Sequence, residues 1–458
     1  MPTPPRAPHA RTLSAVAVAV ATALVAAPLV LAPADAQAFC GFFVGKADAT
    51  LGNRSSQVIV ARHEQKTVIS MLNEYRGALK EFALVVPVPQ VLERGQVNVG
   101  DRRTFERIDA FTAPRLAEYH DPDPCAPLKT RQPFPASLAM DAAAKPERVR
   151  ADKALGVAVE ARYTVGEYEI VILSAKESDG LETWLRRNGY RIPAGASAAL
   201  RPYVLQNMKF FVARVDLAEH AKTGRAWLAP LQFAFESPKF MLPVRLGMLN
   251  ADGPQDMVVY LLTRQGRVET TNYRTLRMPT NVELPGFVRE DFGRTYQAIF
   301  DEQVRREGRG AVFTEHFWDL GWCDPCSADP LSPEELRAAG AFWVPADASK
   351  GGAQPAMVTR LHLRYTRDSL PEDLAFQETA DRAPWQVRYV LRNPWTGDEN
   401  ACPAARPYFE QVRERQEREA ATLASLTAGD LAAIRTRMNL ARRDPPPRWW
   451  ESLWPANR

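Results

Sequence analysis

The sequence lacks the short motifs that mark the common enzyme classes. It contains no Gly-rich phosphate loop, no Gly-x-Ser-x-Gly turn and no His-Glu-x-x-His pair. These absences disfavour nucleotide-dependent enzymes, common hydrolases and zinc proteases, and no cofactor is predicted. One-sided charge is also lacking, because 58 basic and 54 acidic residues leave a formal charge of only +4. This balance predicts no nucleic-acid binding.

Beyond the N-terminus there is no apolar run long enough to cross a bilayer. Residues 1–38 combine a basic start at Arg6 and Arg11, an apolar run over 13–32 and a small-x-small end over 36–38. This pattern is typical of a cleavable export signal. We therefore expect a periplasmic or secreted protein whose mature chain begins at Phe39, with retention of the run as a membrane anchor as the alternative.

The composition, 46% hydrophobic and 24% charged, is that of an ordinary globular protein. Strand-like and helix-like segments are mixed without a regular βαβ alternation, which predicts an α+β fold of mixed or antiparallel sheet with flanking helices. We expect an α+β domain over 39–405 with a candidate sub-boundary near residue 150, a C-terminal helical segment over 406–443, and a tail over 444–458. Strands are predicted at 56–62, 66–72, 82–89, 156–164, 168–174, 209–216, 233–235, 241–249, 257–263, 267–272, 358–365 and 385–391, and helices at 102–117, 178–185, 198–206 and 289–306 and from 332 onward.

Cysteine is scarce, and its odd number leaves at least one thiol without an intramolecular partner. The five cysteines are candidates for disulfides in an exported chain, and two bridges drawn from them allow fifteen arrangements. Loop-closure entropy gives about 2 kcal/mol for a four-residue ring and about 5 kcal/mol for a bridge spanning several hundred residues, as Cys125 with Cys402 would. The short spacing makes Cys323 with Cys326 one natural pair. A second bridge would then be formed by two of the other three cysteines: Cys40, Cys125 and Cys402.

The stretch Trp322–Cys326 (WCDPC) is the one spacing that suggests chemistry. A Trp-Cys-x-x-Cys sequence resembles the active site of thioredoxin-like oxidoreductases, in which Cys323 would attack a disulfide and Cys326 would resolve it. The context differs, because six residues separate the pair from the next helix start at Ser332. A structural disulfide is the simpler interpretation. A zinc site is disfavoured, since no second pair of Cys or His ligands lies at short spacing.

The C-terminal tail combines arginines and prolines with Trp449, Trp450 and Trp454. Such a segment could contact a membrane surface or a partner protein, or pack its tryptophans on the domain.

Several motifs occur in the order of a known family: CGFFV at 40–44, FALVVPVP at 82–89, ESDGLETWL at 177–185 and WDLGWCDPC at 318–326. Together they resemble the exported bacterial proteins grouped as domain of unknown function 2330, over about residues 40–428. The resemblance implies export and supplies no catalytic residue. Our leading hypothesis is a non-enzymatic binding or structural protein held partly by disulfides, with thiol–disulfide exchange through Cys323 and Cys326 as the alternative.

Overall fold

The structure, a computed structural model, describes residues 42–45, 52–76, 82–126, 157–193, 195–225, 227–250, 253–308, 310–322, 329–348 and 352–440. These residues belong to the unit formed by residues 36–458. The predicted sub-boundary near residue 150 lies outside the described residues.

The largest sheet, sheet A, has the strand order β14-β16-β17-β12-β2-β3-β10-β5, with β19 paired to β16. β12 runs parallel to β2 and β14 parallel to β16, and the other neighbours are antiparallel. The strands are β2 Gly52–His63, β3 Lys66–Arg76, β5 Val97–Val99, β10 Leu231–Glu236, β12 Gln255–Thr263, β14 Arg274–Arg277, β16 Ala311–Asp319, β17 Met357–Tyr365 and β19 Trp385–Gln386.

The second sheet, sheet B, is antiparallel throughout and has the order β1-β4-β9-β8-β7. Its strands are β1 Phe42–Gly45, β4 Phe82–Val88, β7 Val157–Val165, β8 Tyr168–Ala175 and β9 Lys209–Val215. Two three-stranded sheets complete the β structure: β11 Met241–Leu242 with β18 Leu374–Glu378 and β13 Val268–Thr270, and β15 Val282–Glu283 with β20 Arg388–Asn393 and β6 Arg115–His120. The mixed and antiparallel sheets confirm the predicted α+β fold.

Sheets A and B pack face to face through a shared apolar core. Alternate residues of β2, β3, β12 and β17 meet alternate residues of β4, β8 and β9, among them Val60, Val259, Val86, Ile172 and Phe211. Central strands such as β4 and β8 are largely buried on both sides, which explains why the sequence shows continuous apolar runs such as FALVVPV instead of strict alternation.

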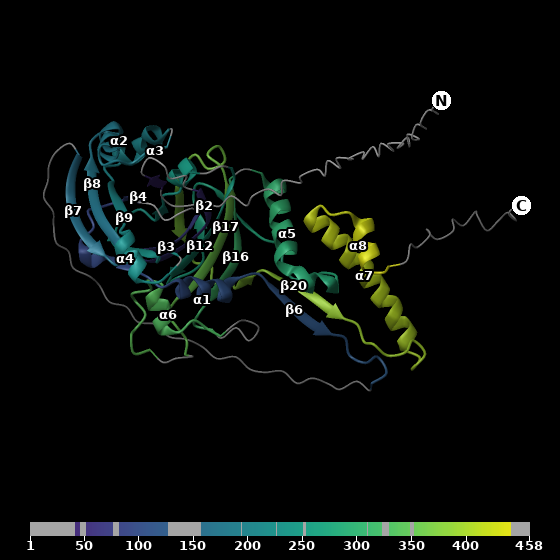
Figure 1. Ribbon diagram of the computed structural model, residues 1–458. Helices are drawn as coiled ribbons and strands as arrows, with labels where there is room; N and C mark the ends of the chain where they lie inside the picture. Colours follow the sequence, from purple (N-terminus) through teal and green to yellow (C-terminus); the bar gives the residue numbers. More distant parts are fainter. Residues whose placement is uncertain are drawn as a thin grey trace, which may run out of the picture. The chain divides into compact units, whose positions relative to one another are not determined.

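Helices cover the outer face of each sheet. α2 (Ser178–Arg187) and α3 (Ala196–Leu205) pack on sheet B through Leu181, Leu185 and Leu200. α1 (Arg102–Thr112), α5 (Phe292–Glu307) and α6 (Pro333–Ala338) pack on the outer face of sheet A. The result is four layers, helix, sheet, sheet and helix (Figure 1). The short helices are α4 Leu217–Lys222, η1 Arg94–Gln96, η2 Arg245–Asn250 and η3 Gly286–Asp291.

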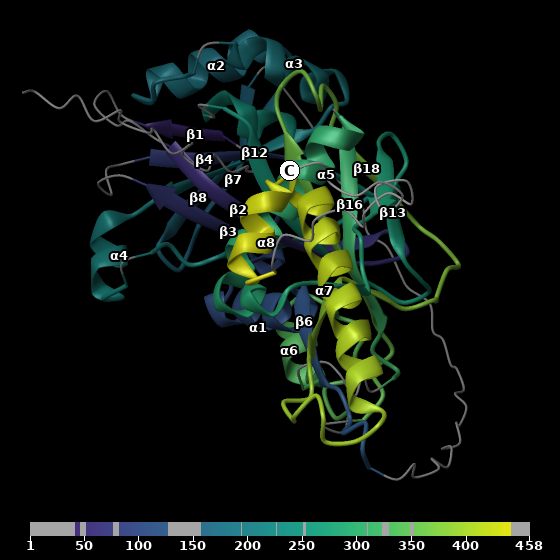
Figure 2. The same cartoon turned by 90° about the vertical axis from the view of Figure 1, so that its right-hand side faces the viewer.

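The predicted C-terminal helical segment forms α7 (Ala405–Thr427) and α8 (Leu431–Arg437). Leu423 and Leu426 of α7 join the apolar cluster that contains Ile299 of α5 and Leu391 of β20. Figure 2 shows α7 extending alongside β6.

Two predicted elements are wrong in part because of proline. The helix predicted over 102–117 ends at Thr112, since Ala113 precedes Pro114 and takes an extended conformation with ψ of 150°. The residues that follow form β6 instead. The strand predicted over 241–249 stops at Leu242 before Pro243, which has no N–H to pair, and the chain continues as η2.

Candidate functional site

A charged network lies buried between sheet A and the helices α1 and α5. Its centre is Glu315, which has no exposed surface and occupies a β-bulge in β16. Glu315 Oε2 accepts from Arg360 Nε at 2.5 Å, and Oε1 lies 2.6 Å from His362 Nδ1. Tyr296 of α5 donates to the same oxygen, and Arg360 Nη1 reaches Asp109 Oδ1 of α1 at 2.5 Å.

Electrostatics keep Glu315 ionised. Burial alone would raise the pKa of Glu315, but His362 and Arg360 outweigh it and lower the pKa to about 2. The partners come from α1, α5 and β17, so the network holds the two helices onto β16 and β17. With Glu315 fully buried, we interpret the network as structural.

His316, the next residue, is also fully buried. Its ring lies edge to face with Phe111, with 5.5 Å between ring centroids, and neither ring nitrogen has a hydrogen-bond partner within the described part of the chain. Burial, together with Arg115 and Arg360, lowers its pKa to about 3. His316 is therefore a neutral core residue.

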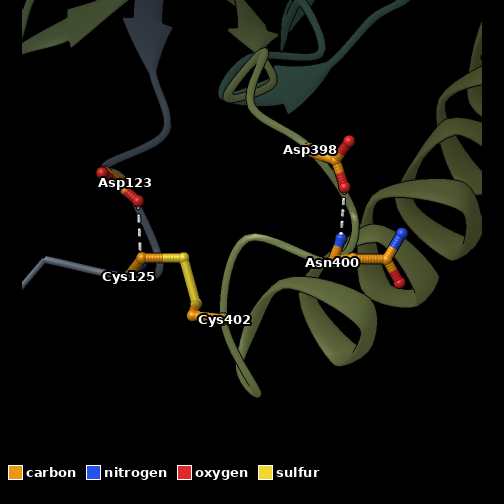
Figure 3. Close-up of a disulfide and its surroundings, with 5 residues drawn as sticks. All are labelled: Asp123, Cys125, Asp398, Asn400 and Cys402. Atoms are coloured by element: carbon orange, nitrogen blue, oxygen red, sulfur yellow. Dashed lines mark hydrogen bonds between the residues drawn. A yellow bond between two sulfur atoms is a disulfide. The ribbon is translucent and has the colours of Figure 1, made fainter.

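Of the cysteines predicted to form disulfides, the structure joins Cys125 to Cys402, 277 positions apart, with 2.08 Å between the sulfur atoms (Figure 3). The bridge links the segment after β6 to the segment before α7. Nearby, Asp121 accepts from Tyr408 Oη at 2.9 Å and from Arg415 Nη2 at 2.7 Å. Bridge and ion pair together fix α7 beside β6.

The remaining predicted site residues are not tested. Cys40, Cys323 and Cys326 lie outside the described residues, as do Trp449, Trp450 and Trp454 in the tail and residues 1–38. Thiol exchange, membrane or partner contact and export therefore stay predictions.

An apolar cavity of about 150 Å³ lies at one end of the space between the two sheets, and we call it the inter-sheet cavity. β3 and β10 of sheet A, β4 of sheet B, the end of α3 and the segment before η2 form its wall. The lining residues are Ile69, Met71, Val86, Pro87, Pro89, Gln206, Met208, Phe233, Phe235, Ser237, Pro238, Lys239, Met241, Leu242 and Pro243.

Proline explains why the sheets leave space here. Pro87 and Pro89 end β4, while Pro238 and Pro243 interrupt the chain after β10, so the walls lack the closely spaced side chains of a continuous strand. An apolar cavity of about this size is large enough to hold a benzene ring.

A second hollow of about 500 Å³ adjoins the cavity and shares Gln206, Lys239 and Met241 with it; we call it the polar cleft. Its other lining residues are Pro202, Phe240, Arg245, Asn272, Glu372, Asp373, Leu374, Ala375 and Phe376.

Asp373 organises the wall of the polar cleft. It accepts from Tyr203 Oη at 2.6 Å and from the backbone N–H of Val244 at 3.0 Å, and it pairs with Arg245 Nη2 at 2.9 Å. Burial would lower the pKa of Arg245, but the hydrogen bond and charge of Asp373 raise it overall. The Arg245 charge is therefore already neutralised by the protein.

The cavity has room for the apolar end of a small molecule, and the adjoining cleft has room for a polar end. Within the described part of the chain, no group of three or more His, Cys, Asp or Glu side chains could hold a metal ion. No helix among the described residues is both long enough and apolar enough to cross a membrane.

A family model described as an uncharacterized protein conserved in bacteria (DUF2330) matches residues 33–377. The chain belongs to the DUF2330 family. The match covers sheet B, all of sheet A except β19, the cavity and the cleft, and it ends within β18. The family resemblance predicted from the sequence motifs is therefore confirmed. No curated protein and no solved structure matches this DUF2330 chain.

Sequence reasoning missed both the network and the cavity. A signal for the network exists, because Glu315 and His316 stand among the apolar residues Val312, Phe313 and Phe317 of β16. The cavity has no local signature, because its walls come from segments far apart in sequence, from Ile69 to Pro243.

Proposed function

We propose that this protein is an exported binding protein that takes up the apolar end of a small ligand between its two sheets. The observation that carries this proposal is the inter-sheet cavity, which opens beside a polar cleft on the same face. Apolar cavities with a few polar groups at their rim are the usual form of small-molecule sites.

The cavity residues favour binding over catalysis. Its polar side chains are Gln206, Ser237 and Lys239. The Ser237 hydroxyl accepts the backbone N–H of Lys239 at 3.1 Å, and among the described residues no acid or histidine lines the cavity to activate that hydroxyl as a nucleophile.

Two observations support export. The first 38 residues have the order of a secretory signal, and a long-range disulfide such as Cys125–Cys402 persists mainly in oxidising compartments. Expression of the full chain with N-terminal sequencing of the periplasmic and culture fractions tests this part. A start at Phe39 agrees with it, whereas an intact N-terminus in the cytoplasm refutes it.

A neutral fluorophore, N-phenyl-1-naphthylamine, tests the binding part, because its emission rises in an apolar site. Titration of the mature protein should saturate at one site. Met241→Trp, which fills the boundary between cavity and cleft, should weaken binding about tenfold or more, because the larger side chain overpacks the space.

The matched control is Leu205→Trp. Leu205 is 76% exposed at the end of α3 and lines neither space, so this variant should bind as the wild type does. Equal affinity for all three proteins would place the fluorophore elsewhere and contradict the proposal.

A further inference from the structure

Lys239 stands where the inter-sheet cavity meets the polar cleft, and it lines both. Its Nζ donates to Gln206 Oε1 at 2.7 Å. Gln206 Nε2 donates in turn to the Pro202 carbonyl at 3.1 Å, which orients the amide with its oxygen toward the lysine.

No described carboxylate forms an ion pair with Lys239. The other cation of the cleft, Arg245, is paired with Asp373 at 2.9 Å. Glu372 also lines the cleft, but its Oε2 accepts from Asn272 Nδ2 at 3.4 Å and is not joined to the lysine. The ammonium of Lys239 has only a neutral acceptor and retains capacity for an anion, since an ammonium donates three hydrogen bonds.

Hydrogen bonds from Arg62 hold the backbone at Lys239. Arg62 donates to the Ser237 carbonyl at 3.0 Å and to the Lys239 carbonyl at 3.4 Å. The guanidinium of Arg62 also lies 5.0 Å from the centre of the Phe240 ring, which packs against Phe376. The backbone at Lys239 is thus held in place before a ligand arrives, so binding need not order this segment.

We propose that the ligand is an organic anion, a carboxylate with a benzene-sized apolar end, and that Lys239 Nζ binds its anionic group. This inference rests on the proposed binding function and adds the class of ligand. The cavity volume of about 150 Å³ sets the size of the apolar end, and the unpaired ammonium at its mouth sets the charge.

The test compares two ligands of the same hydrocarbon, 3-phenylpropionate and the neutral 3-phenylpropan-1-ol, by ligand-observed NMR titration of the mature protein. The wild type should bind the carboxylate about fivefold more tightly, the gain expected of an exposed ion pair, and the preference should shrink with added salt. Lys239→Met should bind both ligands equally and keep the wild-type affinity for the alcohol, while Lys239→Arg should retain the preference. Lys176→Met removes an exposed lysine that lines neither the cavity nor the cleft, so this variant should keep the wild-type preference for the carboxylate.

The outcomes separate this inference from the proposed function. Equal binding of the two ligands by the wild type, or a preference that survives in Lys239→Met, overturns the anionic class and leaves the cavity as a binding site. Binding of neither ligand, together with no response to the neutral fluorophore, overturns both.

Discussion

Replacing Glu315 by glutamine tests whether the buried network holds the helix layer on sheet A. The substitution keeps the shape of the side chain and removes its charge. It leaves Arg360 buried with Asp109 as its remaining carboxylate partner, and it removes the charge facing His362. Loss of the Glu315 charge should therefore weaken the contacts of α1 and α5 with sheet A, which this one carboxylate joins.

The burial of Glu315 sets the expected loss of stability. Breaking one partner of a buried ion pair costs about 3–5 kcal/mol. Unfolding entropy of about 2.1 cal/mol/K per residue, taken over the roughly 420 residues from Phe39 onward, converts this cost into a Tm lower by about 3–6 °C.

The pH profile gives a second readout. The pKa of Glu315 is about 2 in the folded protein, against 4.5 for a free glutamate. A lowered pKa contributes stability that is present above pH 4.5 and is lost as the pH falls toward 2, here about 3 kcal/mol. The stability of Glu315→Gln should therefore fall less than that of the wild type between pH 4.5 and pH 2.

Thermal unfolding followed by circular dichroism between pH 2 and pH 8 checks both effects. Glu169→Gln is the matched control, because its carboxylate pairs with Arg214 at a partly exposed position and should cost under about 1 kcal/mol. A Glu315→Gln protein that melts within 1 °C of the wild type, with the same acid profile, would refute the structural role.

Three further predictions concern stability. The pKa of His316 is lowered to about 3, so the stability that its neutral form contributes is present above pH 6.5 and is lost as the pH falls toward 3. His316→Leu should therefore flatten the fall in Tm between pH 7 and pH 5, and an unchanged slope would contradict this. The double variant Cys125→Ser/Cys402→Ser should lose up to about 5 kcal/mol in urea unfolding, as should the reduced wild type, because the bridge closes a loop of 277 positions; identical midpoints would count against it. Burial raises the pKa of Glu419 to about 7, so the stability of the fold falls as the pH rises from 4.5 through 7. Glu419→Gln should raise the Tm by about 1–3 °C at pH 8 and leave it unchanged at pH 4.5. An equal shift in Tm at both pH values would contradict this prediction.

The strands were predictable wherever both sheet faces are covered. The β-branched run in β2 and the apolar run in β4 each stand out, because a strand between two layers needs apolar side chains on both sides. The end of α1 was predicted too late, although Pro114 is visible in the sequence, because the apolar spacing continues into β6.

The candidate site could not be predicted in this way. Lys239 has no local pattern that distinguishes it from other exposed lysines, and its importance comes from Gln206 and Met241, which only the fold brings beside it.

The central claim is that an apolar ligand end enters the space between the sheets. Crystals of the mature protein soaked with 3-(4-bromophenyl)propan-1-ol, a ligand without charge, locate that end through the anomalous scattering of bromine. We predict one strong peak among Met71, Val86 and Phe233, and none in crystals of Met241→Trp. A peak only outside the cavity, or no peak at a saturating concentration, would contradict the account.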